Sequence, residues 1–430
     1  MTASTPVAIT GYGEVTPLGI DADTTLDAVD AGGLGIRPAP WSGRRTEDGG
    51  VTEALFAGVP SSFDERSVLG ERLAGGCGRQ VAFGIAAAEE ALERADLDPR
   101  SLPPERTAVV DGTSMAGMYP LMLAQHGLER RGVQGVPPKT MLTVWSNMTA
   151  AQLCIRHGLH GPSLTITTAC ASALDAINHA AGLIRAGVVD VALCGGTEGG
   201  WPLGRPGSEL LVPATAVGAR ILGMESPSVA PDRASLPFDV DRKGIVFGEG
   251  AGWFVLESED HRRRRGAVAF GWLVGSWSCA DAHHPSSPAP DGEWEAHVMA
   301  TAQRQADIEP RNVDVVFAHA TGTPLGDIAE ATALRRVFTD GDGPVVTCLK
   351  GHLGHTGASS GAMATVSALR ALGHGTVNPI RGTDRLDPAI DLDVVLHRPR
   401  RLDVAVAQVN AFGFGGQNAS IVLRHPTAHP

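Results

Sequence analysis

Apolar and polar positions along the 430-residue chain alternate between two kinds of segment. Short runs rich in β-branched residues predict buried strands, and longer alanine-rich stretches with helical spacing predict helices. We expect strands at residues 7–10, 107–111, 164–168, 189–194, 252–257, 313–319, 345–348, 404–410 and 420–423, and helices at residues 79–95, 147–157, 171–186, 294–306, 326–338 and 357–372. This alternation is typical of an α/β protein with largely parallel sheets.

The chain also shows a weak internal repeat. A strand at 164–168 and a strand at 313–318 each run into a short turn and then a helix. This repeat predicts two related halves with a site between them, and we place the halves at 1–258 and 259–430.

Segments rich in proline, serine, glycine and aspartate predict loops between these elements. The three longest loops are expected at residues 40–50, 226–235 and 283–292. The charge run at 261–265 predicts a solvated surface where the first half ends.

Composition narrows the possible functions. With 43% hydrophobic and 19% charged residues the chain can bury a large core, and its net charge of −12 argues against nucleic-acid binding. No signal peptide and no apolar run of about 18 residues is apparent, which predicts a cytoplasmic protein with no membrane contact. The six cysteines lack CxxC spacing, so neither a zinc site nor a disulfide framework is expected.

Cys170 is the candidate nucleophile. It lies in the segment TTACASA, where a predicted strand gives way to a helix. The free N–H groups and the positive dipole end of a helix start favour the thiolate form of a cysteine. Small neighbours leave room for a substrate, so we expect Cys170 to be reactive; a buried structural cysteine is the alternative.

A second candidate group surrounds His319 in the segment FAHATGTPLGD. An imidazole at a strand end can donate to, or accept from, a reacting carbonyl. Thr321 and Thr323 offer hydroxyls from the same turn, and Asp327 and Glu330 share one face of the following helix. Taken alone, a structural histidine remains the alternative.

A third segment, CLKGHLGHTGASSG, contains Lys350 and His355. Lysine is rare in this chain, which has only three, so a lysine inside a motif indicates a purpose. Two histidines in the spacing HxxH can indicate a metal pair, but this segment does not otherwise resemble a metal site and we expect no metal.

The last candidate is the segment NAFGFGGQN. Its glycines, including Gly413 and Gly415, permit backbone geometries that expose N–H groups, as an oxyanion site requires. A phosphate-binding loop is the alternative, but no Lys-Ser/Thr pair follows the glycines.

Together and in this order, the four segments form a signature. The sequence resembles the β-ketoacyl-acyl-carrier-protein synthases, which are elongating condensing enzymes (KAS I/II type) of the thiolase superfamily and include the ketosynthases of type II polyketide and polyene systems. The resemblance runs nearly end to end and also covers VAITGYGEVTPLG, PFD, GEGAG and DAHH. It implies an α/β fold, the five-layer αβαβα sandwich of two related halves.

The resemblance implies a role for each candidate. Cys170 would carry the acyl chain, while His319 and His355 would bind the malonyl thioester carbonyl and stabilise the enolate left by decarboxylation. The N–H groups of Cys170 and Phe414 would form the oxyanion hole, Phe414 would also act as a gate, and Lys350 would orient the second histidine. The other implied positions are the carboxylates that hold the lysine, Asp327 and Glu330; the phosphopantetheine-binding Thr321 and Thr323; the tunnel-lining Met115; and the substrate-binding Gly413 and Gly415.

The implied reaction is a decarboxylative Claisen condensation that yields a β-ketoacyl-carrier protein in bacterial fatty-acid or, more specifically, polyketide or polyene synthesis. Substrates would travel on the phosphopantetheine of an acyl carrier protein, with no permanently bound cofactor. The enzyme would be a homodimer or a heterodimer with a ketosynthase-like subunit. Carrier proteins are acidic, so we expect a local arginine cluster to dock them, with the candidates Arg66, Arg72, Arg130 and Arg131.

Two positions depart from the family pattern. Ala320 replaces a glycine after the first histidine, and Ala364 stands where elongating enzymes carry a glutamate. Losing that carboxylate removes a partner of the lysine and points to specialised polyketide or polyene assembly.

Two other interpretations stay open. The first is acyl transfer from Cys170 without condensation. The second is a non-condensing partner subunit (chain-length factor) of a ketosynthase heterodimer, and the intact cysteine argues against it.

Overall fold

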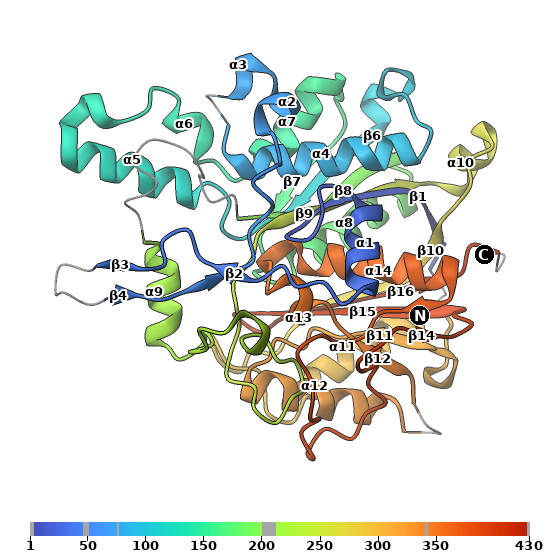
Figure 1. Cartoon of the computed structure of the whole chain (residues 1–430). Helices are drawn as coiled ribbons and strands as arrows, with labels where there is room; N and C mark the ends of the chain where they lie inside the picture. Colours follow the sequence, from blue (N-terminus) through green and yellow to red (C-terminus); the bar gives the residue numbers. More distant parts are fainter. Residues whose placement is uncertain (1–3, 46–50, 75–76, 200–211, 340–342, 428–430) are drawn as a thin grey trace.

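One mixed sheet runs through the molecule. The computed structural model describes residues 4–45, 51–74, 77–199, 212–339 and 343–427. Within them the ten-stranded sheet has the order β12-β11-β15-β16-β10-β1-β9-β8-β6-β7 (Figure 1). Its two sides meet where β1 (Val7–Val15) pairs antiparallel with β10 (Gly271–Ala280), a contact that involves only Val7, Ala8 and Ile9 of β1.

The two sides of the sheet have the same topology. In the orders β1-β9-β8-β6-β7 and β10-β16-β15-β11-β12, the first two neighbouring pairs are antiparallel and the last two are parallel, so the two sides match strand by strand. The remaining strands of the first side are β6 (Thr107–Gly112), β7 (Ser163–Ile166), β8 (Val191–Glu198) and β9 (Gly250–Glu257), and those of the second are β11 (Val315–Phe317), β12 (Val345–Thr347), β15 (Val406–Gly413) and β16 (Gln417–Arg424).

This topology supports two related halves but corrects the repeat inferred from sequence. The strand that precedes Cys170 is β7, and its equivalent in the second half is β12. The sequence comparison had paired it with β11 instead, because both are followed by a turn and a helix. The division at 258/259 stays a prediction; β9 ends at Glu257 and β10 begins at Gly271.

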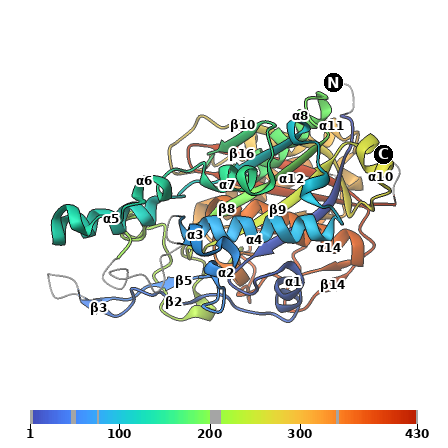
Figure 2. The ribbon, with the colours of Figure 1, turned by 90° about the horizontal axis from the view of Figure 1, so that it is seen from above.

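Helices form three layers around the two half-sheets (Figures 1 and 2). In the centre, α8 (Ser172–Arg185) and α14 (Ser360–His374) contact each other and strands of both halves. The outer layers are α4 (Arg79–Arg94) with α7 (Met148–His157) on the first half, and α11 (Glu293–Gln305) with α12 (Pro324–Val337) on the second. The predicted five-layer αβαβα sandwich is therefore confirmed.

Close approach between layers depends on small residues. A Cβ on Gly11 of β1 would lie 2.0 Å from the backbone oxygen of Ala91 in α4, so only glycine lets this helix lie directly on the strand. Small residues also let the central helix α8 pack closely against its neighbours: its residues Ala173, Ala176 and Ala180 are completely buried.

Smaller elements connect these layers. The longer ones are α1 (Ala22–Asp30), α5 (Met118–Arg131), α9 (Ala214–Ile221) and α10 (Glu259–Arg265). The short ones are β2 (Arg37–Pro38), β3 (Arg44–Arg45), β4 (Val51–Thr52), β5 (Leu55–Phe56), β13 (Thr376–Val377), β14 (Arg400–Arg401), α2 (Glu65–Leu69), α3 (Glu71–Ala74), α6 (Thr140–Thr143) and α13 (Lys350–Leu353). None of the helices in the described ranges is both long and apolar enough to cross a membrane.

All nine predicted strands and six predicted helices are present, with shifted ends, but β10 was missed. Although most of it is buried, its sequence GWLVGSWSCA interrupts the apolar residues with glycine and serine, so it shows neither alternating polarity nor a continuous apolar run. The charge run at 261–265 lies in α10, and the loop predicted at 40–50 contains β3 and continues at 46–50 outside the described residues.

Candidate active site

A strained turn presents Cys170. It follows β7 and precedes α8, and the preceding residue, Ala169, has a left-handed φ of 51°, which is unfavourable for a residue with a Cβ. Ser172 holds the turn together: its hydroxyl accepts from the N–H of Thr168 at 2.9 Å and donates to the oxygen of Ala169 at 2.6 Å. The sulfur is thereby fixed at the start of the central helix.

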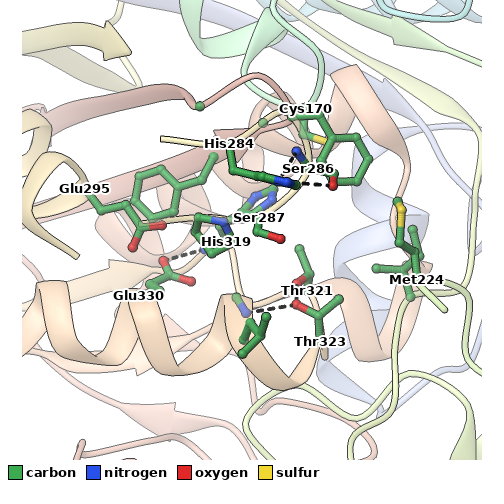
Figure 3. A pocket seen from close by; sticks show the side chains of 18 of the residues that line it. Cys170, Met224, His284, Ser286, Ser287, Glu295, His319, Thr321, Thr323 and Glu330 are labelled. Carbon is green, nitrogen blue, oxygen red and sulfur yellow. Dashed lines mark hydrogen bonds between the residues drawn. The ribbon is translucent and has the colours of Figure 1, made fainter. Parts of the chain in front are cut away.

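The predicted residues converge on one cavity of about 370 Å³. Cys170 reaches it from the first half, and His319 and His355 reach it from the second (Figure 3). One ligand-type atom from each of these three side chains lies within 4.8 Å of the others. The other predicted residues that line the cavity are Thr321, Thr323, Glu330, Gly413, Phe414 and Gly415.

His355 is the partner of the thiol. Its Nε2 lies 3.0 Å from Sγ of Cys170, and its Nδ1 lies 3.1 Å from the hydroxyl of Ser360 at the start of α14. The main chain of His355 is held by the first half of the molecule, because its N–H donates to the oxygen of Val246 at 2.6 Å. Burial lowers the pKa of the imidazole well below its usual value, so it is neutral and can accept a proton.

The prediction of a resting thiolate at Cys170 is wrong. Burial raises the pKa of the thiol to about 12, and the opposing effects of Lys350 and of two backbone N–H groups are smaller. Helix α8 begins only at Ser172, so the sulfur is not inside its first turn. Cys170 therefore rests as a neutral thiol and needs His355 to take its proton.

Two backbone N–H groups point at the sulfur. They belong to Cys170 itself and to Phe414, and both lower the pKa of the thiol. These are the two donors that the sequence assigned to an oxyanion hole, and they meet because Gly413 lets the turn after β15 pack against the backbone at Cys170. The side chain of Phe414 is 46% exposed, and its role as a gate stays a prediction.

Lys350 contacts the first histidine, which corrects the expectation that it orients the second. Its Nζ lies 3.3 Å from Nδ1 of His319 and donates to the backbone oxygen of the same residue. An ammonium that donates to Nδ1 leaves the ring proton on Nε2, so His319 is held as a hydrogen-bond donor toward the cavity. Burial lowers the pKa of this histidine well below its usual value, and the Lys350 charge lowers it further.

Asp327 and Glu330 act on the lysine through their charges, which raise its pKa against the larger effect of burial, while their hydrogen bonds go to the backbone. Glu330 accepts from the N–H of His319 at 2.8 Å and from that of Ala320 at 2.6 Å. Asp327 accepts from the N–H of Gly322 at 3.0 Å and from that of Phe238 at 2.7 Å. Both carboxylates project from α12 and accept hydrogen bonds from the turn that joins β11 to this helix. They therefore fix the backbone around the first histidine.

Ala320 and Ala364 show what the two departures do. Ala320 has a φ of 33°, a left-handed conformation that suits the glycine expected there, so the turn after His319 is strained. Ala364 lines a small separate cavity that also reaches Lys350, with room for about one water-sized molecule. The hydrogen bonds of the lysine go to His319, and the nearby charges of Glu330 and Asp327 raise its pKa.

Met115 is not part of this cavity. It lies in the turn after β6, where its N–H donates to Glu198 at 2.9 Å, and it is absent from the lining of the cavity that holds Cys170. Its assignment to an acyl tunnel stays a prediction. Residues without an assigned role also line the cavity. Those from the segments DAHH and NAFGFGGQN quoted above are Asp281, His284, Phe412 and Asn418, and those that sequence reasoning missed entirely are Leu222, Met224, Ile245, Ser286, Ser287, Glu295 and Leu325.

Fold and site together define a class of enzyme. A duplicated thiolase-like sandwich carries a cysteine beside two N–H donors, and two neutral imidazoles face that cysteine across the seam. Such a set of groups suits formation of an acyl-enzyme and stabilisation of an oxyanion or enolate. The class is that of the acyl-transferring condensing enzymes.

Comparison with known families identifies the branch. The family described as β-ketoacyl synthase, N-terminal domain, matches residues 4–262, and β-ketoacyl synthase, C-terminal domain, matches residues 270–384. The chain belongs to the β-ketoacyl synthase family.

Relatives and solved structures agree with this placement. The chain is 32% identical to 3-oxoacyl-[acyl-carrier-protein] synthase 2 of Vibrio harveyi, over 97% of this chain and 98% of that one. It is 31% identical to the mitochondrial 3-oxoacyl-[acyl-carrier-protein] synthase of Arabidopsis thaliana, over 97% and 92%. The ishigamide ketosynthase/chain length factor (28% identity) and the AntDE:AntF type II polyketide ketosynthase complex (26%) both superpose with TM-score 0.86, over 98% of this chain and 99% of theirs.

Proposed function

We propose that this chain joins an acyl group held on Cys170 to a malonyl unit by decarboxylative Claisen condensation, in polyketide or polyene assembly. Both substrates would arrive on the phosphopantetheine arm of an acyl carrier protein. The observation that carries the proposal is the contact of 3.0 Å between the Cys170 sulfur and His355, in a cavity that also holds His319 and two N–H donors. Support for the polyketide branch comes from the similarity to polyketide ketosynthases.

In the first step the thiol proton of Cys170 passes to Nε2 of His355. The sulfur attacks the acyl thioester, the N–H groups of Cys170 and Phe414 bind the oxyanion, and the carrier thiol leaves with the proton from His355. This step requires the His355 tautomer whose Nδ1–H donates to Ser360.

In the second step the malonyl thioester oxygen accepts from His319 and His355. The bond to the carboxylate breaks, CO₂ leaves, and its electron pair forms the enolate. The enolate carbon then attacks the acyl-cysteine carbonyl, and the C–S bond breaks to release the Cys170 thiolate. One proton is consumed overall: the thiolate takes it from Nε2 of His355, and solvent returns a proton to the imidazole. His355 must now donate from Nε2, and the Ser360 hydroxyl allows this because it can donate to Nδ1 as readily as accept from it.

The direct test mixes the purified enzyme with acyl- and malonyl-carrier proteins of several chain lengths. We expect a β-ketoacyl product and one CO₂ for each extension, with loss of acyl loading in Cys170→Ala. Cys154→Ala is the matched control, because Cys154 lies in α7 outside the cavity, and it should load normally. Acyl loading without CO₂ release or product would show acyl transfer alone and refute the proposal.

Carrier docking would use the rim of the cavity. Leu222 and Leu325 are 70% and 68% exposed there, and Arg220 and Lys243 line an adjoining hollow. We propose these two cations as docking residues in addition to the arginines expected from sequence, so Lys243→Glu should raise the KM for the carrier protein, and the difference should shrink at high salt.

The arginines named from sequence stay predictions. Arg66 pairs with Glu71 at 3.8 Å on the surface, and the side chain of Arg72 lies outside the described residues. Arg130 and Arg131 lie at the end of α5.

A second ketosynthase-like chain would cover the edge strand β7. This strand pairs on one side only, with β6, and Leu164 in it is 38% exposed. Helices α5 to α7 add exposed apolar side chains at Leu121, Leu128, Met141, Leu142, Trp145 and Ile155. We expect Leu164→Arg to produce monomers in sedimentation velocity, while Ile20→Arg, an exposed apolar site before α1, leaves the oligomer intact. Unchanged sedimentation of the first variant would contradict this interface.

A further inference from the structure

Glu295 is a buried acid that the mechanism does not use. It lies in the first turn of α11, is 4% exposed and lines the cavity of Cys170. Its Oε2 has no hydrogen-bond partner among the described residues. An unpaired buried carboxyl is costly, so its position against a substrate cavity indicates that a ligand supplies the missing partner.

Asn418 in β16 has the same property. It is 3% exposed, lines the same cavity, and its Nδ2 also lacks a partner in the described structure. It pairs across the sheet with Phe412 and with Cys279, and the sulfur of Cys279 donates to the oxygen of Trp294, the residue before Glu295, at 3.6 Å. The two unpartnered groups therefore lie at the same end of the cavity.

This part of the cavity lies on the other side of His319 from Met224. Figure 3 shows Glu295 and Met224 on opposite sides of His319, with Glu295 beside Glu330. The ring of Phe412 lies 5.9 Å from the ring of His319 and forms part of the wall between them. Glu295 therefore lies in a part of the cavity on the other side of His319 from Met224.

The local charges select the kind of ligand. Burial, followed by the nearby carboxylates of Glu330 and Asp281, raises the pKa of Glu295 well above its usual value. This shift favours the protonated carboxyl, which can donate a hydrogen bond, as can the Asn418 amide. A neutral oxygen fits two donors, whereas an anion would meet the carboxylates of Asp281 and Glu330.

We propose that Glu295 and Asn418 form a specificity subsite that binds a ketone or hydroxyl oxygen on an oxygenated acyl chain. The subsite rests on the proposed condensing function and names the substrate class: acyl chains that carry oxygen are accepted, and saturated chains are disfavoured. A saturated chain leaves both polar groups buried without partners, and a site built to hydrogen-bond an oxygen discriminates strongly against an analogue that lacks it.

The test compares hexanoyl- with 3-oxohexanoyl- and 3,5-dioxohexanoyl-carrier protein at saturating malonyl-carrier protein. We expect the wild type to favour an oxygenated chain in kcat/KM. In Glu295→Leu this preference should fall about 10–100-fold, with the saturated chain gaining, and Glu295→Gln should retain part of it because an amide still donates. Loading of Cys170 by each acyl group is followed in parallel by intact-protein mass spectrometry.

Glu14→Leu is the matched control. Glu14 is 1% exposed in β1, its Oε2 is likewise unpartnered among the described residues, and it is absent from the cavity lining. This variant should leave the acyl preference unchanged, and thermal denaturation of every variant establishes that each is folded.

The possible failures are distinguishable. A wild type that makes no β-ketoacyl product from any donor refutes the condensing function, while the loading assay still tests the subsite. An unchanged acyl preference in folded Glu295→Leu overturns the subsite. A separate titration of malonyl-carrier protein completes the test: a KM for malonyl raised equally with all acyl chains, with the acyl preference unchanged, would assign the two residues to the extender unit and also overturn the subsite.

Discussion

Gly413 is the residue at which a single methyl group should separate the two donors of the oxyanion hole. A Cβ at this position would lie 2.8 Å from the oxygen of Thr168 and 3.0 Å from the nitrogen of Cys170, whereas ordinary contact begins at 3.4 Å. Gly413→Ala must therefore displace the nucleophile turn from the following residue, Phe414, by roughly half an ångström. The N–H groups of Cys170 and Phe414 can then no longer both donate to the same oxyanion at good geometry.

The expected loss can be scaled from this displacement. Misplacement by about 1 Å costs roughly 100-fold in rate, and removal of one oxyanion donor costs about 100–1,000-fold. For roughly half an ångström we expect kcat to fall about 10–100-fold in Gly413→Ala. The assay is the steady-state rate of β-ketoacyl product formation, together with pre-steady-state acyl loading of Cys170, which uses the same hole and should slow to a similar extent.

Gly182→Ala provides the comparison. Gly182 lies within α8, and an added Cβ there meets no atom within 4 Å, so the substitution should stabilise the helix by about 0.5–1 kcal/mol and leave kcat unchanged. The reasoning fails if folded Gly413→Ala retains the wild-type kcat. A lower melting temperature with normal kcat would show that Gly413 matters for packing alone.

Three further outcomes follow from the site. Because burial raises the pKa of Cys170 to about 12, its alkylation by iodoacetamide should accelerate from pH 7 through pH 10 without a plateau, and a plateau near pH 8 in mass spectrometry would contradict this. Lys350→Met removes the donor to His319 Nδ1, so CO₂ release from malonyl-carrier protein should fall about 100-fold, while alkylation of Cys170 persists. Ala320→Gly relieves a left-handed alanine and should raise stability by up to about 1 kcal/mol in denaturant unfolding, whereas a loss of stability would show that the turn is not strained.

The positions of the reacting groups could be predicted from sequence because each follows a local signal. Cys170, His319 and His355 each come after an apolar strand and before a helix of small residues, and such turns gather at one edge of parallel strands. Their environment could not be predicted in the same way. The protonation of Cys170 depends on its burial in the folded protein. That Lys350 contacts His319 rather than His355 depends on a contact between residues 31 positions apart.

Glu295 and Asn418 show the same limit for specificity. Glu295 lies in an amphipathic helix with no chemical motif around it, and Asn418 ends the segment NAFGFGGQN, in which only the glycines and Phe414 were assigned a role. What marks them is the lack of a partner within a shared cavity, and this property exists only once α11 has packed against β16. A sequence pattern records helix and strand periods, but it does not record which buried polar atoms remain unpaired.

The duplication explains why the site needs both halves. Strands β7 and β12 are equivalent, so the connection from β7 through Cys170 to α8 matches the connection from β12 through Lys350 and His355 to α14. Helices α8 and α14 pack against each other in the central layer, which brings the two connections together and leaves sulfur and imidazole 3.0 Å apart.

By the same correspondence, the turn after β11 that carries His319 matches the turn after β6 that carries Met115. In the first half this turn is bonded to Glu198, whereas in the second it bears an imidazole facing the sulfur. Each kind of connection is therefore present twice, once in each half. The nucleophile lies in the first half, and the histidines and the lysine that hold or transfer protons lie in the second. Neither half alone contains a site that could both form an acyl-enzyme and stabilise an enolate.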